Sequence, residues 1–175
     1  MEEYTKAHVE HNGDQFPKQT IYDFFVYHLN RIYPAKSRME EILSELLEQL
    51  TFSDVAVLIR KTLNLVRNQV QRLREIYDLL QLTPLPPEPN DLLGLIEEAY
   101  RGIMQQREDT LGFDLSVLAY LQTVESLEIA SFKVLQLAAG ELANPFISEL
   151  LNQSIAESEQ DYALLLELMT RYIGH

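Results

Sequence analysis

The sequence predicts an all-α protein built as a bundle of four long helices, and three observations support this. Four separate segments place apolar residues every three or four positions, the spacing of one face of a helix. No segment shows the alternation typical of a half-buried strand. Glycine occurs only 6 times in 175 residues and tryptophan does not occur, while Leu, Glu, Ala, Gln and Arg are abundant, a composition that favours helix over sheet.

The first two long helices are expected before residue 83. The first, over about residues 20 to 50, carries an apolar row that a single charged residue interrupts: Phe25, Leu29, Ile32, Lys36, Met39, Leu43, Leu46 and Leu50. Pro34 lies inside this helix and removes one backbone hydrogen bond, so a kink is expected just before Lys36. The second helix follows Ser53, a good N-cap residue, and its row has no interruption: Ala56, Ile59, Leu63, Val66, Val70, Leu73, Tyr77 and Leu80.

The run TPLPPEPN at residues 83 to 90 divides the chain, because proline lacks the amide donor and restricts the residue before it. Asn90 or Asp91 can then cap a short amphipathic helix, DLLGLIEEAYRGIMQQ. The third long helix is expected over about residues 113 to 139, ending near Gly140. The fourth begins at Asn144, a cap followed by proline at the first helical position, and runs almost to the C-terminus.

Each helix must bury its apolar stripe against others, so the four long helices are expected to close into a four-helix bundle. They form two helical hairpins joined by a long crossover that contains the short helix, which would let the second and third long helices run parallel. We therefore expect a single domain over residues 20–173, preceded by a flexible polar leader over residues 1–19.

Charge and composition exclude several classes of partner. The formal net charge of −13 would repel nucleic acid and anionic membrane surfaces. The chain has no cysteine, which excludes disulfides, zinc-thiolate sites and thiol nucleophiles. The polar, acidic start is not a signal peptide, and no apolar run approaches the ~18 residues of a membrane span. We expect a cytoplasmic protein with no nucleic-acid or membrane partner.

Carboxylates stand in the middle of the third long helix, within YLQTVESLEIASF, where apolar residues lie on nearly every side. Glu125 and Glu128 each interrupt an apolar row of this helix. The fourth long helix repeats the arrangement with Glu157 and Asp161, four apart on one face. Burying ionised carboxylates unpaired costs several kcal/mol each, so a metal, another cation or water must compensate them.

Five stretches carry a resemblance to a known family: YDFFVYHLNRIYPAKSRM, NQVQRL, GLIEEA, VESLEIASF and SELLNQSIAESEQDYALL. Over nearly all of residues 21 to 170 the chain resembles the ferritin-like superfamily and, within it, the stress-associated bacterial YciF-like family of unknown function. The resemblance implies a ferritin-like bundle. It also implies a dinuclear iron or manganese centre, held by one Glu from each of two helices and a Glu-x-x-His pair, or a variant of it, from each of the others.

The implied ligand set is incomplete here. Glu125 and Glu128 match the family's acidic pair of the third helix, and Glu157 and Asp161 match its Glu and Asp of the fourth. The Glu of the first helix corresponds to Lys36. The Glu-x-x-His of the second helix corresponds to Asn64 and Arg67, and no histidine in the chain follows a Glu by three residues.

The two cations at lost ligand positions suggest how the carboxylates are compensated. A lysine ammonium or an arginine fork satisfies carboxylate oxygens without needing coordination geometry. We therefore interpret the four acids as a vestigial metal site in which Lys36 and Arg67 replace the metal's charge, although either cation could instead reach solvent.

The resulting hypothesis is a non-catalytic ferritin-like bundle without a cofactor, homodimeric, with a structural or protein-interaction role that the resemblance connects with stress. One alternative is a metal-binding protein that keeps a reduced iron or manganese site on the third and fourth long helices. Another is an adaptor whose crossover or C-terminal surface binds an unidentified protein partner.

Overall fold

All the regular structure in this computed structural model is helical. The structure describes residues 17–86, 90–142 and 144–174, and those ranges contain no strand, which confirms the all-α prediction. The helices are α1 (Lys18–Leu47), α2 (Ser53–Leu79), α3 (Asp91–Met104), α4 (Thr110–Ala139) and α5 (Pro145–Ile173). Most of the predicted leader lies outside the described residues, and its last two positions belong to the first turn of α1.

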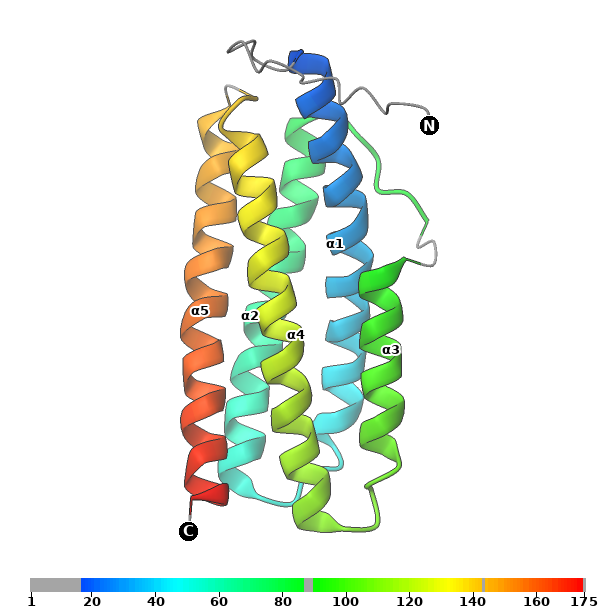
Figure 1. Cartoon of the computed structure of the whole chain (residues 1–175), viewed down its shortest axis with the longest axis vertical. Helices are drawn as coiled ribbons and strands as arrows, with labels where there is room; N and C mark the ends of the chain where they lie inside the picture. The colour runs from blue at the N-terminus through cyan, green and yellow to red at the C-terminus, as the bar shows by residue number, and fades with distance from the viewer. Residues whose placement is uncertain (1–16, 87–89, 143, 175) are drawn as a thin grey trace, which may run out of the picture.

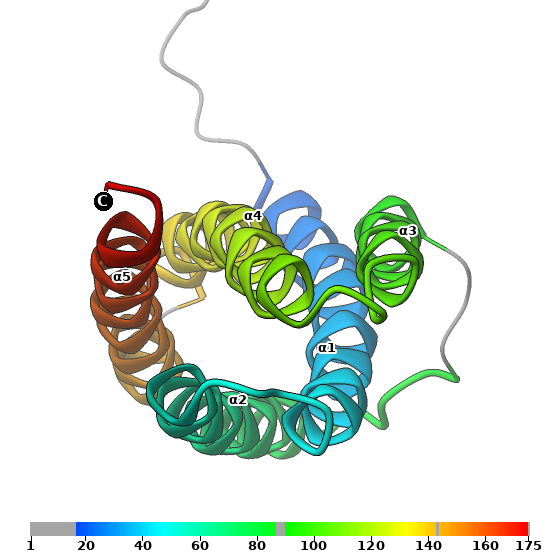
Figure 2. The ribbon, with the colours of Figure 1, turned by 90° about the horizontal axis from the view of Figure 1, so that it is seen from below.

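The four long helices pack side by side (Figure 1). α1 contacts α2 and α4, and α5 contacts the same two helices, so seen from the end the four form a ring around a common core (Figure 2). α2 and α4 run in the same direction, as a long crossover between two hairpins requires. Among the helices that the structure describes, none is both long and apolar enough to cross a membrane.

The short helix α3 lies outside the ring, against α1 and α4 (Figure 2). Its start is capped as predicted, because the Asn90 side chain accepts a hydrogen bond of 2.9 Å from the amide of Leu93. Arg31 of α1 binds both carboxylate oxygens of Asp91, each at 2.6 Å. One apolar face of α3 is buried against the bundle through Leu92, Ile96 and Ile103.

The turn between α1 and α2 differs from the sequence prediction. Ser53 is the first residue of α2 rather than its cap, and the cap position is Phe52, whose side chain has no acceptor. Asp114, buried in α4, accepts hydrogen bonds from the backbone amides of Phe52 at 2.8 Å and Thr51 at 3.2 Å. A carboxylate from the second hairpin therefore satisfies the turn of the first.

The ends of two helices also shift slightly. α1 ends at Leu47 instead of residue 50, and α4 begins at Thr110 instead of residue 113. The earlier start of α4 follows from the amide of Phe113, which donates to the carbonyl of Asp109 at 2.7 Å and so adds a first turn. Helix α1 continues through Pro34.

Candidate functional site

A lysine and a glutamate form an ion pair in the interior of the bundle. Lys36 follows Ile32 by one turn in the apolar row of α1, and this position directs its side chain into the core. Its Nζ lies 2.6 Å from Oε2 of Glu128 on α4, and both side chains are 0% exposed. Lys36 Nζ also approaches Sδ of Met39 at 3.9 Å. Among the described residues, Glu128 is the only one that forms an ion pair with Lys36.

Two further carboxyl groups are buried beside this pair. The pKa of Glu125 is raised to about 8, chiefly because burial disfavours the charged form. The positive charge of Lys36 and a hydrogen bond with Ser158 oppose the rise, and the nearby acids Glu128 and Asp161 add to it. Burial also raises the pKa of Asp161, and the hydroxyl of Thr62, which donates to Asp161 Oδ2 at 2.7 Å, counteracts the rise. The cluster therefore joins α1, α2, α4 and α5.

The cluster holds more carboxyl groups than cations. Burial raises the pKa of Glu128 as well, while Lys36 lowers it by its charge and by the hydrogen bond. One ammonium balances one carboxylate, and a carboxyl group with a pKa of about 8 keeps its proton at neutral pH. Within the described residues, one oxygen of each acid has no hydrogen-bond partner: Glu125 Oε2, Glu128 Oε1 and Asp161 Oδ1.

Two residues predicted for the site lie elsewhere. Glu157 sits at the margin of α5 and binds Arg72 of α2 through both oxygens, each at 2.6 Å. The side chain of Arg67 is 50% exposed and pairs with Glu40 of α1 at 3.1 Å. Arg67 therefore does not compensate the buried carboxylates, and the inward pairing that we predicted for it is wrong.

The second helix contributes other residues than the ones predicted. Asn64 and Arg67 are exposed, whereas Gln69, two positions after Arg67, is buried. Gln69 Nε2 donates to the carbonyl of Ser154 at 3.2 Å and to Oγ of Ser158 at 3.0 Å, both on α5. This network was not predicted from the sequence. The signal that could have indicated it is the small polar residues Thr62, Ser154 and Ser158, which lie on helix faces that are otherwise largely apolar.

The cluster does not match the ligand set of a dinuclear metal centre. Such a centre needs several carboxylate and imidazole ligands around a shared position. The described part of the chain contains no group of three or more His, Asp or Glu side chains arranged to hold a metal ion. A lysine ammonium stands among the acids, and His28, the histidine that the structure describes, lies beside Arg31 instead.

Comparisons with known proteins agree with the fold. A family model described as "Domain of unknown function (DUF892)" matches residues 20–174. YcfI from Rhodopseudomonas palustris, provisionally described as a structural protein, is a solved structure with 26% identity, covering 87% of this chain and 96% of its own, with a TM-score of 0.76. The E. coli stress protein YciF has 23% identity, covering 88% of this chain and 97% of its own, with a TM-score of 0.79. No curated protein matched the sequence.

Proposed function

The chain belongs to the family described as a domain of unknown function (DUF892), and on that premise we propose that it is a non-catalytic ferritin-like bundle. In this proposal an internal ion pair has replaced a dinuclear metal centre, and the protein has a structural or protein-binding role. It acts in the cytoplasm as a homodimer, without a cofactor.

The observation that carries the proposal is the pair between Lys36 and Glu128, 2.6 Å apart and fully buried. An ammonium supplies one positive charge where a dinuclear centre supplies about four, so it can balance only one of the surrounding acids. Burial raises the pKa of both other acids, and Glu125, with a pKa of about 8, holds its proton at neutral pH. A core that neutralises its acids in this way needs no metal to fold.

The structural role and its connection with stress rest on the relatives. YcfI is provisionally described as a structural protein and YciF as a stress protein. We extend both descriptions to this chain because it shares the family and the fold of these relatives. Among the described residues, the acids Glu125, Glu128 and Asp161 lie in the core and are at most 2% exposed.

The proposed dimer uses the outer face of α3 and α4. Leu95 of α3 shares a shallow groove with Leu127 and Val134 of α4. Leu137, further along α4, is 79% exposed. Apolar residues gathered on one outer face are typical of an interface, and a second copy would cover them.

A reduced metal site is the second candidate, and the three carboxylate oxygens without a partner favour it. Manganese and magnesium can bind carboxylates alone, so Glu125 and Asp161 could share one ion, provided that Glu125 loses its proton and both groups are ionised. Such binding would be weak at neutral pH, because the ion must displace the proton of Glu125 and tolerate the charge of Lys36.

Metal analysis of protein purified without chelator separates the two candidates. The proposal predicts far less than one iron or manganese per chain, and a thermal unfolding midpoint that neither EDTA nor added Mn²⁺ moves. One tightly held metal ion per chain, with a midpoint that EDTA lowers, would establish the second candidate and reject the first.

A further inference from the structure

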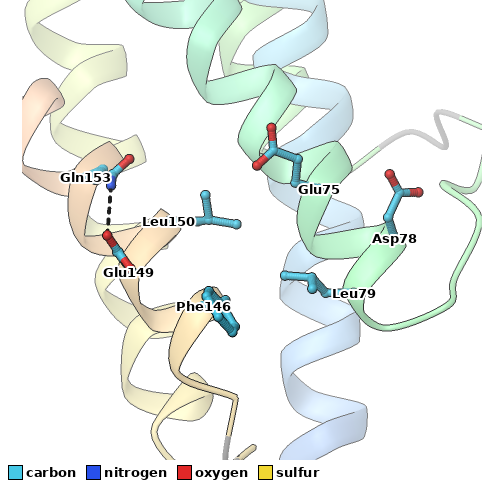
Figure 3. Close-up of a pocket in the computed structure, with 7 residues that line it drawn as sticks. All are labelled: Glu75, Asp78, Leu79, Phe146, Glu149, Leu150 and Gln153. Carbon is cyan, nitrogen blue, oxygen red and sulfur yellow. Dashed lines mark hydrogen bonds between the residues drawn. The ribbon is translucent and has the colours of Figure 1, made fainter.

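A second groove runs between the C-terminal end of α2 and the first turns of α5 (Figure 3). Its volume is about 570 Å³, and its floor is apolar. Leu79 from α2 and Leu150 from α5 point toward each other across it, and Phe146 lies beside them with 66% of its surface exposed. This groove, which we call the α2–α5 groove, is far from the α3–α4 face proposed for the dimer.

The rim of the α2–α5 groove is acidic. Glu75 and Asp78 stand on the α2 side and Glu149 on the α5 side. Among the ion pairs formed by the described residues, none includes any of these three carboxylates, and Glu149 receives only a long hydrogen bond of 3.4 Å from Gln153. Several acids elsewhere on the bundle do pair with a basic side chain, as Asp91 does with Arg31. The groove therefore concentrates negative charge around an apolar floor.

The same molecule shows how such a groove is filled. On the α1–α4 side a short helix, α3, buries Leu92 and Ile96 against the ring and fixes its position by the ion pair of its Asp91 with Arg31. No helix of the described chain covers the α2–α5 side in the same way. At the α2–α5 groove the acidic residues belong to the four-helix ring, so a helix that docks there must carry the basic residues.

We propose that the α2–α5 groove binds a basic amphipathic helix of a partner protein, which inserts one or two apolar side chains between Leu79 and Phe146 and places lysine or arginine residues against Glu75, Asp78 and Glu149. This inference rests on the protein-binding role proposed above and specifies the chemistry of the partner. A small cation would use the carboxylates but not Phe146, and a second copy of this chain, with its net charge of −13, lacks the required charge.

A synthetic helix can test the proposal on the full-length protein. The probe is a fluorescein-labelled amphipathic peptide of leucine and lysine with the length of α3, 14 residues. Fluorescence anisotropy at about 150 mM salt, where exposed charges are largely screened beyond ~8 Å, measures its affinity. A second peptide with glutamate in place of lysine serves as the charge control and should not bind.

Variants then locate the binding site. The double change Glu75→Lys and Glu149→Lys should weaken binding at least about tenfold, since repulsion replaces attraction. The change Phe146→Ala should weaken it about fivefold or more by removing the apolar anchor. The matched double change Glu48→Lys and Glu108→Lys, which adds equal charge at the opposite end of the bundle, should alter the affinity less than about twofold. Circular dichroism checks that each variant keeps its helix content.

Three results would overturn the proposal. One is the absence of saturable binding, and another is equal weakening by the groove and control variants, which would indicate attraction to the overall charge. The third is loss of the homodimer in the Glu75→Lys and Glu149→Lys variant by light scattering, which would assign the groove to a second copy. None of these measurements depends on metal content, so failure here is distinguishable from failure of the proposed metal-free bundle.

Discussion

Replacing Lys36 by methionine tests how much the buried ion pair matters. Methionine keeps the length of the lysine stem and removes the charge, so Glu128 loses its partner while both positions remain 0% exposed. Breaking a buried pair from one side costs about 3–5 kcal/mol, because a desolvated charge is left unpaired. Glu128 can relieve part of this by taking up a proton, so we expect a loss of about 3 kcal/mol in the free energy of unfolding at pH 7.

Urea unfolding monitored by circular dichroism measures that loss. With a denaturant slope of about 2–3 kcal/mol per molar, the midpoint should fall by about 1 M. The matched control is Lys133→Met. Lys133 forms an ion pair with Glu159 at the same distance, 2.6 Å, but the side chains are 55% and 51% exposed. An exposed pair contributes at most about 1 kcal/mol, so the control should change little.

A double variant and a change of pH complete the test. Lys36→Met combined with Glu128→Leu removes both charges and should recover most of the stability, since apolar replacement of a buried pair is often neutral or favourable. The single variant should lose less stability at pH 5 than at pH 8, because protonation of Glu128 is easier at the lower pH. Equal midpoints for Lys36→Met and Lys133→Met would refute the reasoning.

Three further predictions concern the buried acids, the metal site and the dimer. The folded pKa of Glu125, about 8, lies above its ordinary value of 4.5, so the contribution of Glu125 to the free energy of unfolding should be fully present below pH 4.5 and be lost as the pH rises through 8. Glu125→Gln should flatten this decline and give a higher thermal midpoint than wild type at pH 8. An unchanged pH profile in the variant would contradict this prediction. Lys36→Glu with Gln69→His should make the thermal midpoint depend on Mn²⁺. Asn64→Glu with Arg67→His, at the two exposed α2 positions that match the family motif, should not. Calorimetry with and without Mn²⁺ measures the midpoint of each variant. Light scattering at micromolar concentration should give a dimer that Leu137→Lys dissociates, and a wild-type monomer would reject this interface.

Helical periodicity was sufficient to predict much of the core. Lys36 of α1 and Glu125 and Glu128 of α4 stand in apolar rows, which predicted that they face the core, and all three are buried. For Lys36 the alternative was that its long stem carries the ammonium to solvent, but the structure pairs it with Glu128 instead. The resemblance to YciF-like proteins, predicted from short stretches, is confirmed by the family match over residues 20–174 and by the solved relatives.

Arg67 and Glu157, which we predicted to face the core, lie at helix margins. Helical periodicity does not determine whether a side chain at a margin points inward or outward. Arg67 is about a quarter turn from the row of α2, and its long side chain pairs with Glu40 near the surface. Glu157 was read as inward, but Arg72 on the neighbouring helix lies near enough to hold it at the edge. Which side chain pairs across two helices depends on their separation and rotation, and neither is encoded in the spacing along one helix.

The carboxylate of Asp114 also bears on the order in which the chain folds. It belongs to α4, yet it accepts the amides of Thr51 and Phe52 at the turn of the first hairpin, more than 60 residues earlier. Until α4 docks, that turn has no acceptor for those amides except water, so the first hairpin gains its full stability only when the second arrives. The two halves of the chain are thus coupled into one cooperative folding unit, and an isolated first hairpin would be a poor autonomous fragment.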